Sequence, residues 1–348
     1  MALVMVQGHV AEALLSPAHR AEPLYQLQNT IHGSTAPGFL FASGFVAGLP
    51  RAPLSPRAAV RRARRLLFVL GVGYAIHLPY FSAWKILLQA TPAERAALLA
   101  CDALQAIAVT QLGALLLQWL FGRRWTAVGG LVSVLVIAAT PAVWRTQPSL
   151  SLPLPLGAYL DPATGSRFPL FPFSAFVLSG AVAGAAIGRQ EPRTRHRRAV
   201  AWGLGLCGAG VVLSGLLAGR VDFWGPSPAY VLLRLGGLLL LLRGFEAAAA
   251  RSWAVLRPLV LLGHETLLVY VLHLLLLFGG VFGPGPLQPF VGQLGFGAAG
   301  TLLLAMLPVL LAAAWTWNRV KAHAPGEASL ALTFLGVAFS FELLARPW

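Results

Sequence analysis

The sequence contains few charged residues, few acidic residues in particular, and almost no cysteine. Charged residues make up 11% of the 348 positions, with 11 Asp and Glu against 26 Lys and Arg. Because a soluble domain carries about 25% charged residues, this composition excludes an ordinary soluble protein. The two cysteines, Cys101 and Cys207, lie in or beside apolar segments. They belong to no Cys-rich motif, so the sequence predicts neither a disulfide framework nor a metal site.

Long polar stretches are also missing, as is a glycine-rich phosphate-binding loop. Without them the chain has no separate soluble domain that could bind a nucleotide and drive a pump. The formal net charge of +15 does not indicate nucleic-acid binding, because the cations sit in short clusters between apolar runs. The first apolar run begins at Met1 with no basic segment before it, so we expect no cleavable signal peptide.

Apolar residues fill most of the chain, at 57% of all positions. They form successive runs of about 17–25 residues, the length a helix needs to cross a bilayer. We therefore expect an all-α, polytopic integral membrane protein with about 11 transmembrane helices in a single domain, residues 1–348. The expected helices are 1–16, 35–50, 65–82, 101–121, 125–144, 169–188, 199–219, 228–245, 258–280, 296–317 and 328–345.

The distribution of Lys and Arg between loops predicts the orientation. Cations are concentrated in alternate loops, which is the pattern of cytoplasmic loops. These arginine-rich loops include residues 51–65, 123–124, 189–198, 243–257 and 319–321. We therefore expect a cytoplasmic N-terminus in the cytoplasmic (inner) membrane. The opposite loops, expected outside, include residues 17–34, 83–100, 145–168, 220–227 and 281–295.

Ionisable and amide side chains within the apolar runs are the candidates for function. Such groups are costly in a membrane and commonly line a bundle interior or a water-filled cavity. The candidates are His9, Glu12, His32, His77, Asp102, Gln105, Gln111, Arg234, His264, Glu265, Tyr270, His273 and Glu342. Of these, His77, Glu265 and Glu342 are interpreted as structural, whereas His9 and His32 favour a functional interpretation.

Helical spacing groups some of these candidates. Glu12 follows His9 by three residues, Gln105 follows Asp102 by three, and His273 follows Tyr270 by three. Residues three apart share one face of a helix. The predicted topology places His9, Glu12, His32, His77 and Asp102 in the outer half of the membrane, so a polar cluster on the outer side is expected.

Five stretches together resemble a known family. They are HGSTAPGFLFASGFVAGL, RRARRLLFVLGVGYAIHL, CDALQAIAVTQL, FPLFPFSAFVLSGAVAG and LGHETLLVYVLHLLLL, spread over residues 32–278. In this order and spacing they resemble the heparan-α-glucosaminide N-acetyltransferase catalytic-domain family. The resemblance implies a transmembrane acyltransferase that takes an acyl group, typically acetyl, from acyl-CoA at the cytoplasmic face. The acceptor that it implies is a sugar amine or hydroxyl on the far side.

The resemblance also implies roles for individual residues. His9 and His32 match the family's helix-one histidine and the histidine before its second helix. Asp102 and Gln105 match the polar start of its fourth helix. Tyr270 and His273 match its late Tyr/His helix. One departure concerns the start: relatives have an acidic residue and Arg-Gly just before the stretch that matches MALVMVQGHV, and this sequence begins after that place. Either the natural start lies upstream, or the element is missing.

Acyl transfer requires a general base, for which histidine is suited near neutral pH. His9, His32 and Asp102 are therefore the expected catalytic residues, with Glu12 or Asp102 orienting a ring. A covalent acyl-histidine is left open. Gln105, Tyr270 and His273 are the expected substrate-binding residues. Arg234 is the expected partner of a coenzyme A phosphate, because a guanidinium binds phosphate through a fork of donors.

Two other functions remain open from the sequence. One is a transporter or flippase of lipid or saccharide, in which the same polar residues would line a path. The other is a non-catalytic membrane subunit derived from acyltransferases. For the favoured enzyme we expect acetyl-CoA or another acyl-CoA as donor, no metal, no nucleic acid, membrane lipid around the helices, and a small-molecule or glycan acceptor. A homodimer is left open.

Overall fold

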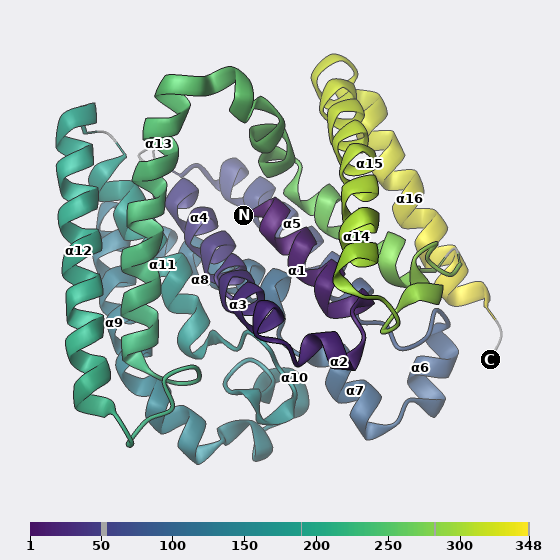
Figure 1. Ribbon diagram of the computed structural model, residues 1–348, viewed down its shortest axis with the longest axis horizontal. Helices are drawn as coiled ribbons and strands as arrows, with labels where there is room; N and C mark the ends of the chain where they lie inside the picture. The colour runs from purple at the N-terminus through teal and green to yellow at the C-terminus, as the bar shows by residue number, and fades with distance from the viewer. Residues whose placement is uncertain (50–53, 189, 282, 347–348) are drawn as a thin grey trace. The chain divides into compact units, whose positions relative to one another are not determined.

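The computed structural model describes residues 1–49, 54–188, 190–281 and 283–346, and these residues form helices without a β-strand. Figure 1 labels the helices along the chain. The longer ones are α1 (Ala2–Leu14), α3 (Pro23–His32), α4 (Thr35–Gly48), α5 (Pro56–Ile76), α8 (Ala103–Phe121), α9 (Trp125–Thr146), α11 (Leu170–Ile187), α12 (Pro192–Leu217), α13 (Pro228–His264), α14 (Thr266–Phe278), α15 (Phe296–His323) and α16 (Pro325–Ala345).

The all-α prediction is confirmed, and a helix overlaps each of the eleven predicted ranges. The count of about eleven spans is not confirmed. Among the described residues, five helical stretches are long and apolar enough to cross a membrane, or six if one bent pair forms a single span. They are Ala103–Thr146, Leu170–Ile187, Arg193–Leu217, Phe296–His323 and Pro325–Ala345, with Leu256–His264 and Thr266–Phe278 as the bent pair.

Several segments expected to be loops are helical. Residues 17–34 contain α2 (Pro17–Arg20) and α3, and residues 83–100 contain α6 (Ala83–Gln89) and α7 (Pro92–Leu99). The expected loop 246–257 lies inside α13, where the sequence EAAAAR consists of strong helix formers. The polarity of these segments suggested loops, but polarity does not oppose helix formation. Arg51 and Arg189, two cations of the predicted cytoplasmic loops, lie outside the described residues.

The chain divides into two compact units. Unit 1 contains Met1–Thr35, Tyr80–Ala90 and Ala249–Trp348, and unit 2 contains Ala36–Pro79 and Thr91–Ala248. Each unit is therefore assembled from stretches that are far apart in the sequence. The sequence-based prediction of a single domain over residues 1–348 stays a prediction.

Unit 2 is organised around a close crossing of α4 and α11. Gly44 and Gly48 lie on one face of α4, and Gly180 and Gly184 lie on one face of α11. A Cβ atom at any of these four glycines would come closer than 3.0 Å to a carbonyl oxygen of the opposite helix. This arrangement is the small-residue interface common between membrane helices, in which missing side chains let two backbones touch.

Side-chain hydrogen bonds attach further helices to this crossing. On α9, which packs along α11, the Ser133 hydroxyl lies 2.8 Å from the Ser179 hydroxyl. On α8, the Gln111 amide donates to the Ser43 carbonyl of α4 at 2.9 Å. The α5 helix packs along α8, and Gly73 of α5 contacts the side chain of Gln105. These contacts position the start of α8, which carries Asp102.

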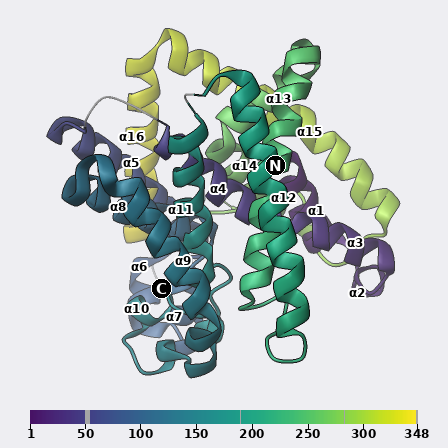
Figure 2. The same cartoon turned by 90° about the vertical axis from the view of Figure 1, so that its left-hand side faces the viewer.

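Unit 1 holds the end of α1 through backbone hydrogen bonds. The last carbonyls of a helix have no partner within that helix. Here the Gly292 N–H donates to the Ala13 carbonyl at 2.8 Å, and the Leu294 N–H donates to the Leu14 carbonyl at 2.9 Å. The α1 helix also packs against α3, α14 and α15. The helices α15 and α16 follow one another and diverge from their connection, as Figure 2 shows.

A sharp break separates α13 from α14 within the range where the sequence predicted one helix, 258–280. The two helical segments meet at an angle of 85°, with Glu265 between them. The Glu265 side chain is buried and accepts hydrogen bonds from Lys321 Nζ at 2.6 Å and from Asn318 Nδ2 at 2.8 Å. Glu265 thus lies at the bend, and its hydrogen bonds connect the bend to α15.

We expect Gly44→Ala and Gly180→Ala to destabilise the protein. The added methyl group would meet a backbone carbonyl, which cannot rotate away as a flexible side chain can. We expect a loss of about 1–3 kcal/mol, as for overpacked cores, measured as a lower midpoint of thermal unfolding in detergent.

Gly113→Ala, in α8, is the matched control, because a Cβ atom at Gly113 would meet nothing within 4 Å. Since alanine favours a helix over glycine by about 1 kcal/mol, this variant should be neutral or stabilising. Equal midpoints for all three variants would contradict the close α4–α11 crossing.

Candidate functional site

Four aromatic polar side chains gather in unit 1, from three helices that are distant in the sequence. His9 comes from the middle of α1, and His32 is the last residue of α3. Tyr270 and His273 lie on successive turns of α14. We call these four residues the histidine cluster. The structure therefore brings together four of the residues that the sequence singled out.

His9 is the centre of the histidine cluster. Its Nδ1 atom lies 2.7 Å from Nε2 of His273, within hydrogen-bonding distance. The ring centroid of His32 lies 5.2 Å from that of His9, with the ring planes at 72°. The Tyr270 ring lies 6.1 Å from the His9 ring and 5.6 Å from the His273 ring. His9 is half-buried, whereas His273 is fully buried.

The backbone of α1 makes room for this arrangement. A Cβ atom at Gly8 would overlap the His32 ring, so only glycine allows α3 to bring His32 this close. The Nδ1 atom of His32 faces the Val4 carbonyl at 3.3 Å. The Thr35 hydroxyl donates to the His32 carbonyl at 2.7 Å, at the end of α3. Hydrogen-bonding contacts therefore position both the side chain and the backbone of His32.

Histidine is the side chain most often used as a general acid or base in enzymes. Among the described residues, no group of three or more His, Cys, Asp or Glu side chains could hold a metal ion. Glu12, which helical spacing suggested as the partner of the His9 ring, is exposed. The His9 ring lies within hydrogen-bonding distance of His273, which comes from a helix that the sequence could not place beside α1.

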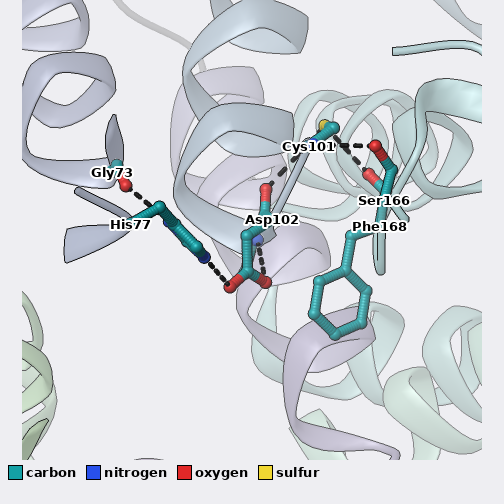
Figure 3. Close-up of polar contacts among 7 residues, drawn as sticks. Gly73, His77, Cys101, Asp102, Ser166 and Phe168 are labelled. Carbon is teal, nitrogen blue, oxygen red and sulfur yellow. Dashed lines mark hydrogen bonds and ion pairs between the residues drawn. The ribbon is translucent and has the colours of Figure 1, made fainter. Parts of the chain in front are cut away.

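A second polar site lies in unit 2, where α5 ends and α8 begins. Figure 3 shows His77, the residue after α5, pointing at Asp102, the residue before α8. The two side chains meet at 3.3 Å, between His77 Nε2 and Asp102 Oδ2. His77 Nδ1 faces the Gly73 carbonyl at 2.8 Å, and Asp102 Oδ1 accepts from the Ala103 N–H at 2.7 Å.

The segment before Asp102 is fixed by the loop that precedes α11, also seen in Figure 3. The Cys101 N–H donates to the Ser166 hydroxyl at 2.9 Å, and the Cys101 thiol donates to the Phe168 carbonyl at 3.2 Å. The Phe168 N–H returns a bond to the Cys101 carbonyl at 3.0 Å. Cys101 is fully buried, so we interpret its thiol as part of the packing of this segment rather than as a reactive group.

Both nitrogens of His77 face acceptors, one a carbonyl and one a carboxylate. When both nitrogens carry hydrogen, the ring is an imidazolium ion paired with the Asp102 carboxylate. The hydrogen bond to Asp102 raises the pKa of His77, although burial opposes this effect. Burial alone would raise the pKa of the Asp102 carboxyl, but the bonds from His77 and Ala103 and the charges of His77 and Arg167 lower it. Both residues lie outside the helices that could span a membrane.

Gln105 and Arg234 lie in unit 2 as well. Gln105 is fully buried in the first turn of α8, and neither its amide nitrogen nor its amide oxygen has a hydrogen-bond partner. Arg234 lies in α13 with its guanidinium over the Tyr230 ring, 5.0 Å from the centroid. A buried amide without a partner is unusual in a folded protein.

Sequence reasoning gave His77 no functional weight and expected Asp102 to act with another histidine. The signal that could have found the pair is positional, because His77 ends one helix and Asp102 starts another. The pairing of Glu265 with Lys321 was also missed. An acidic residue within an apolar run indicates that a polar partner is needed, but the sequence does not identify that partner.

The His77–Asp102 pair predicts a pH dependence of stability. The pKa of His77 is raised above its ordinary 6.5, so its contribution is present at lower pH and is lost as the pH rises through the folded-state pKa. The pKa of Asp102 is lowered below 3.8, so its contribution is present above that value and is lost in stronger acid. The pair therefore stabilises the fold most between these limits.

We expect Asp102→Asn to lose about 1.5–3 kcal/mol, the contribution of a hydrogen bond to a charged group, and to lose it mainly near pH 5. The difference from wild type should shrink as the pH rises through the folded-state pKa of His77, which lies above 6.5. Thermal unfolding in detergent over this pH range measures it. His323→Gln removes an exposed histidine and serves as the control. A difference that stays constant with pH would contradict the charged pair.

Comparison with family models places the whole chain up to residue 314 in one family. The model for an acyltransferase domain matches residues 1–314, which include the histidine cluster and the His77–Asp102 pair. Comparison with curated proteins and with solved structures gave no match. The match covers most of the chain, and the apolar helices are consistent with a membrane location. The chain belongs to the acyltransferase domain family, acyltransferase-3, and is a membrane acyltransferase.

Proposed function

We propose that this acyltransferase moves an acetyl group from acetyl-CoA to a hydroxyl or amine of a sugar-like acceptor outside the cytoplasm, with His9 as the general base. The observation that carries the proposal is the position of His9 at the centre of the histidine cluster. His32 and Tyr270 face it from two other helices. The acetyl donor and the sugar-like acceptor rest on the resemblance to heparan-α-glucosaminide N-acetyltransferases.

The reaction requires one proton transfer and one exchange of bonds. His9 takes the proton from the acceptor hydroxyl while the acceptor oxygen attacks the thioester carbonyl. The tetrahedral intermediate then breaks its carbon–sulfur bond, and the leaving thiolate takes the proton back from the His9 imidazolium. The products are the acetylated acceptor and free coenzyme A. A positioned base of this kind contributes about 10²–10⁴-fold to the rate.

Arg234 and Gln105 keep in this proposal the binding roles that the sequence predicts for them. The Tyr230 ring holds the Arg234 guanidinium, which would bind a phosphate of coenzyme A. The unpaired amide of Gln105 would accept and donate hydrogen bonds to an acceptor hydroxyl or to a bridging water. His77 and Arg167 lower the pKa of Asp102 and so favour its charged form. In this proposal Asp102 would orient His77 rather than act as a base.

The transporter and the non-catalytic subunit are weaker alternatives. Membership of the acyltransferase family supports an enzyme over a transport path lined by the same histidines. The histidine cluster supplies the kind of side chain that can act as a base in acyl transfer, which favours an enzyme over a non-catalytic descendant. The localisation that the predicted topology indicates for the enzyme is the cytoplasmic (inner) membrane, with the acyl donor on the cytoplasmic side.

We expect His9→Ala to reduce acetyl-CoA turnover by at least about 100-fold, because the base is lost. His32→Ala should also reduce turnover, since its ring packs edge-on against His9. Purified protein in nanodiscs is supplied with acetyl-CoA, and released coenzyme A is measured as free thiol. The chain itself has only two cysteines, one of them fully buried, so its background is small.

His323→Ala is the control, because this exposed histidine bonds to the Arg319 carbonyl within its own helix. It should turn over acetyl-CoA like wild type. Coenzyme A binding is measured separately for each variant by calorimetry. Full turnover in a folded His9→Ala variant would overturn the proposed base. Absence of coenzyme A binding in wild type would instead remove acyl-CoA as the donor.

A further inference from the structure

The hydrogen bonds of His273 determine where its proton lies. Its Nδ1 atom is 2.8 Å from the Val269 carbonyl, one turn back in α14. A carbonyl oxygen can only accept, so Nδ1 of His273 carries the hydrogen. A doubly protonated ring would place a charge on a side chain that is 0% exposed, which is costly. His273 is therefore neutral, and its Nε2 atom carries a lone pair.

The same reasoning extends to His9. The Nε2 atom of His273 is an acceptor and lies 2.7 Å from Nδ1 of His9. Nδ1 of His9 must then be the donor, which leaves the lone pair of His9 on Nε2. The two rings are nearly parallel, at 10°, with centroids 5.0 Å apart. One tautomer of His9 thus follows from a chain of bonds that begins at the Val269 carbonyl.

We propose that His273 is a positioning residue that fixes His9 as its Nδ1–H tautomer and so makes Nε2 the basic atom. The sequence assigned His273 to substrate binding, and the geometry gives it another role. A second group that holds a catalytic histidine in one tautomer is a general device, because the wrong tautomer presents a donor where a base is needed. This inference rests on the proposed function only where it calls His9 the base.

Tyr270 and His32 are the other two members of the histidine cluster. His32 approaches His9 edge-on and directs its own Nδ1 towards the Val4 carbonyl. Tyr270 lies one turn before His273 on α14, with its ring tilted at 59° to that of His9. The 2.7 Å contact with His273 is the observation that assigns the tautomer of His9.

Two substitutions separate the bond to His9 from the bond to Val269. In His273→Gln the amide can reach the place of Nε2 and present its oxygen to His9. In His273→Asn the shorter amide can still donate to the Val269 carbonyl but cannot reach His9. Both variants keep a polar side chain in the same buried place, so their comparison controls for loss of the ring. Leu275→Ala, at an exposed position on the same helix, is the control for α14.

The first readout is the ¹⁵N spectrum of histidine-labelled protein in nanodiscs, with the His9 signal identified by its loss in His9→Gln. We expect the Nδ1–H tautomer of His9 in wild type and in His273→Gln, and a mixture or the Nε2–H tautomer in His273→Asn. The second readout is steady-state turnover of acetyl-CoA. His273→Asn should lower kcat by about 10–100-fold with KM little changed, and His273→Gln should recover most of kcat.

The two readouts distinguish this inference from the proposed function. Retention of the Nδ1–H tautomer in His273→Asn would overturn the positioning role, whatever the activity. A switch of tautomer without any change in turnover would leave the bond assignment intact and would refute His9 as the base. Thermal unfolding of both variants shows whether they fold. If neither folds, the wild-type spectrum alone decides, because an Nε2–H tautomer of His9 would contradict the inference.

Discussion

An ionisable side chain among apolar helices needs a partner, because an unpaired polar group in low dielectric surroundings costs several kcal/mol. This requirement organises the polar residues of the chain. His9 bonds to His273, Asp102 pairs with His77, and Glu265 accepts from Lys321 and Asn318. In each case the partner comes from another helix or from the end of one. Each of these polar contacts therefore joins two helices or helix ends.

The partner also decides what a histidine can do. His77 faces a carboxylate and a carbonyl, so it is held as a cation and stabilises the junction of α5 and α8. His9 faces a neutral imidazole, so it keeps a lone pair. The same residue type thus serves as an ion-pair partner in unit 2 and as a candidate base in unit 1. In the proposed acyl transfer, the second arrangement is the one that would take a proton from the acceptor.

The sequence was most informative about the fold class and least informative about which helices contact each other. Apolar run length predicted the all-α membrane class, and the scarcity of ionisable groups in those runs selected His9, His32, Tyr270 and His273. These four side chains come together because α1, α3 and α14 pack against one another. The packing of helices that are distant in the chain cannot be predicted from the periodicity of a single sequence. Glu12 was expected to orient His9 because helical spacing only reveals neighbours on the same helix. His273, a neighbour from another helix, lies 264 residues away and carries no such signal.

Helix boundaries show the same division between local and tertiary information. Residues 246–257 read as a loop from their charge, yet the Ala-rich segment continues α13. The run 258–280 read as one helix from its hydropathy, yet it bends by 85° at Glu265. Position 265 is glutamate, and although Gly263 lies two residues before it, an isolated glycine in an apolar run does not by itself predict a bend. The bend depends on the buried carboxylate reaching Lys321 and Asn318 on α15, which is a tertiary contact.

The coupling between His9 and His273 tests the account most directly. A double-mutant cycle on kcat/KM for acetyl-CoA compares His9→Ala, His273→Asn and the double variant in nanodiscs. If His273 acts only through His9, the double variant should be no slower than His9→Ala alone. If the two losses multiply, the residues act independently. That result would contradict the proposal that His273 affects catalysis through His9.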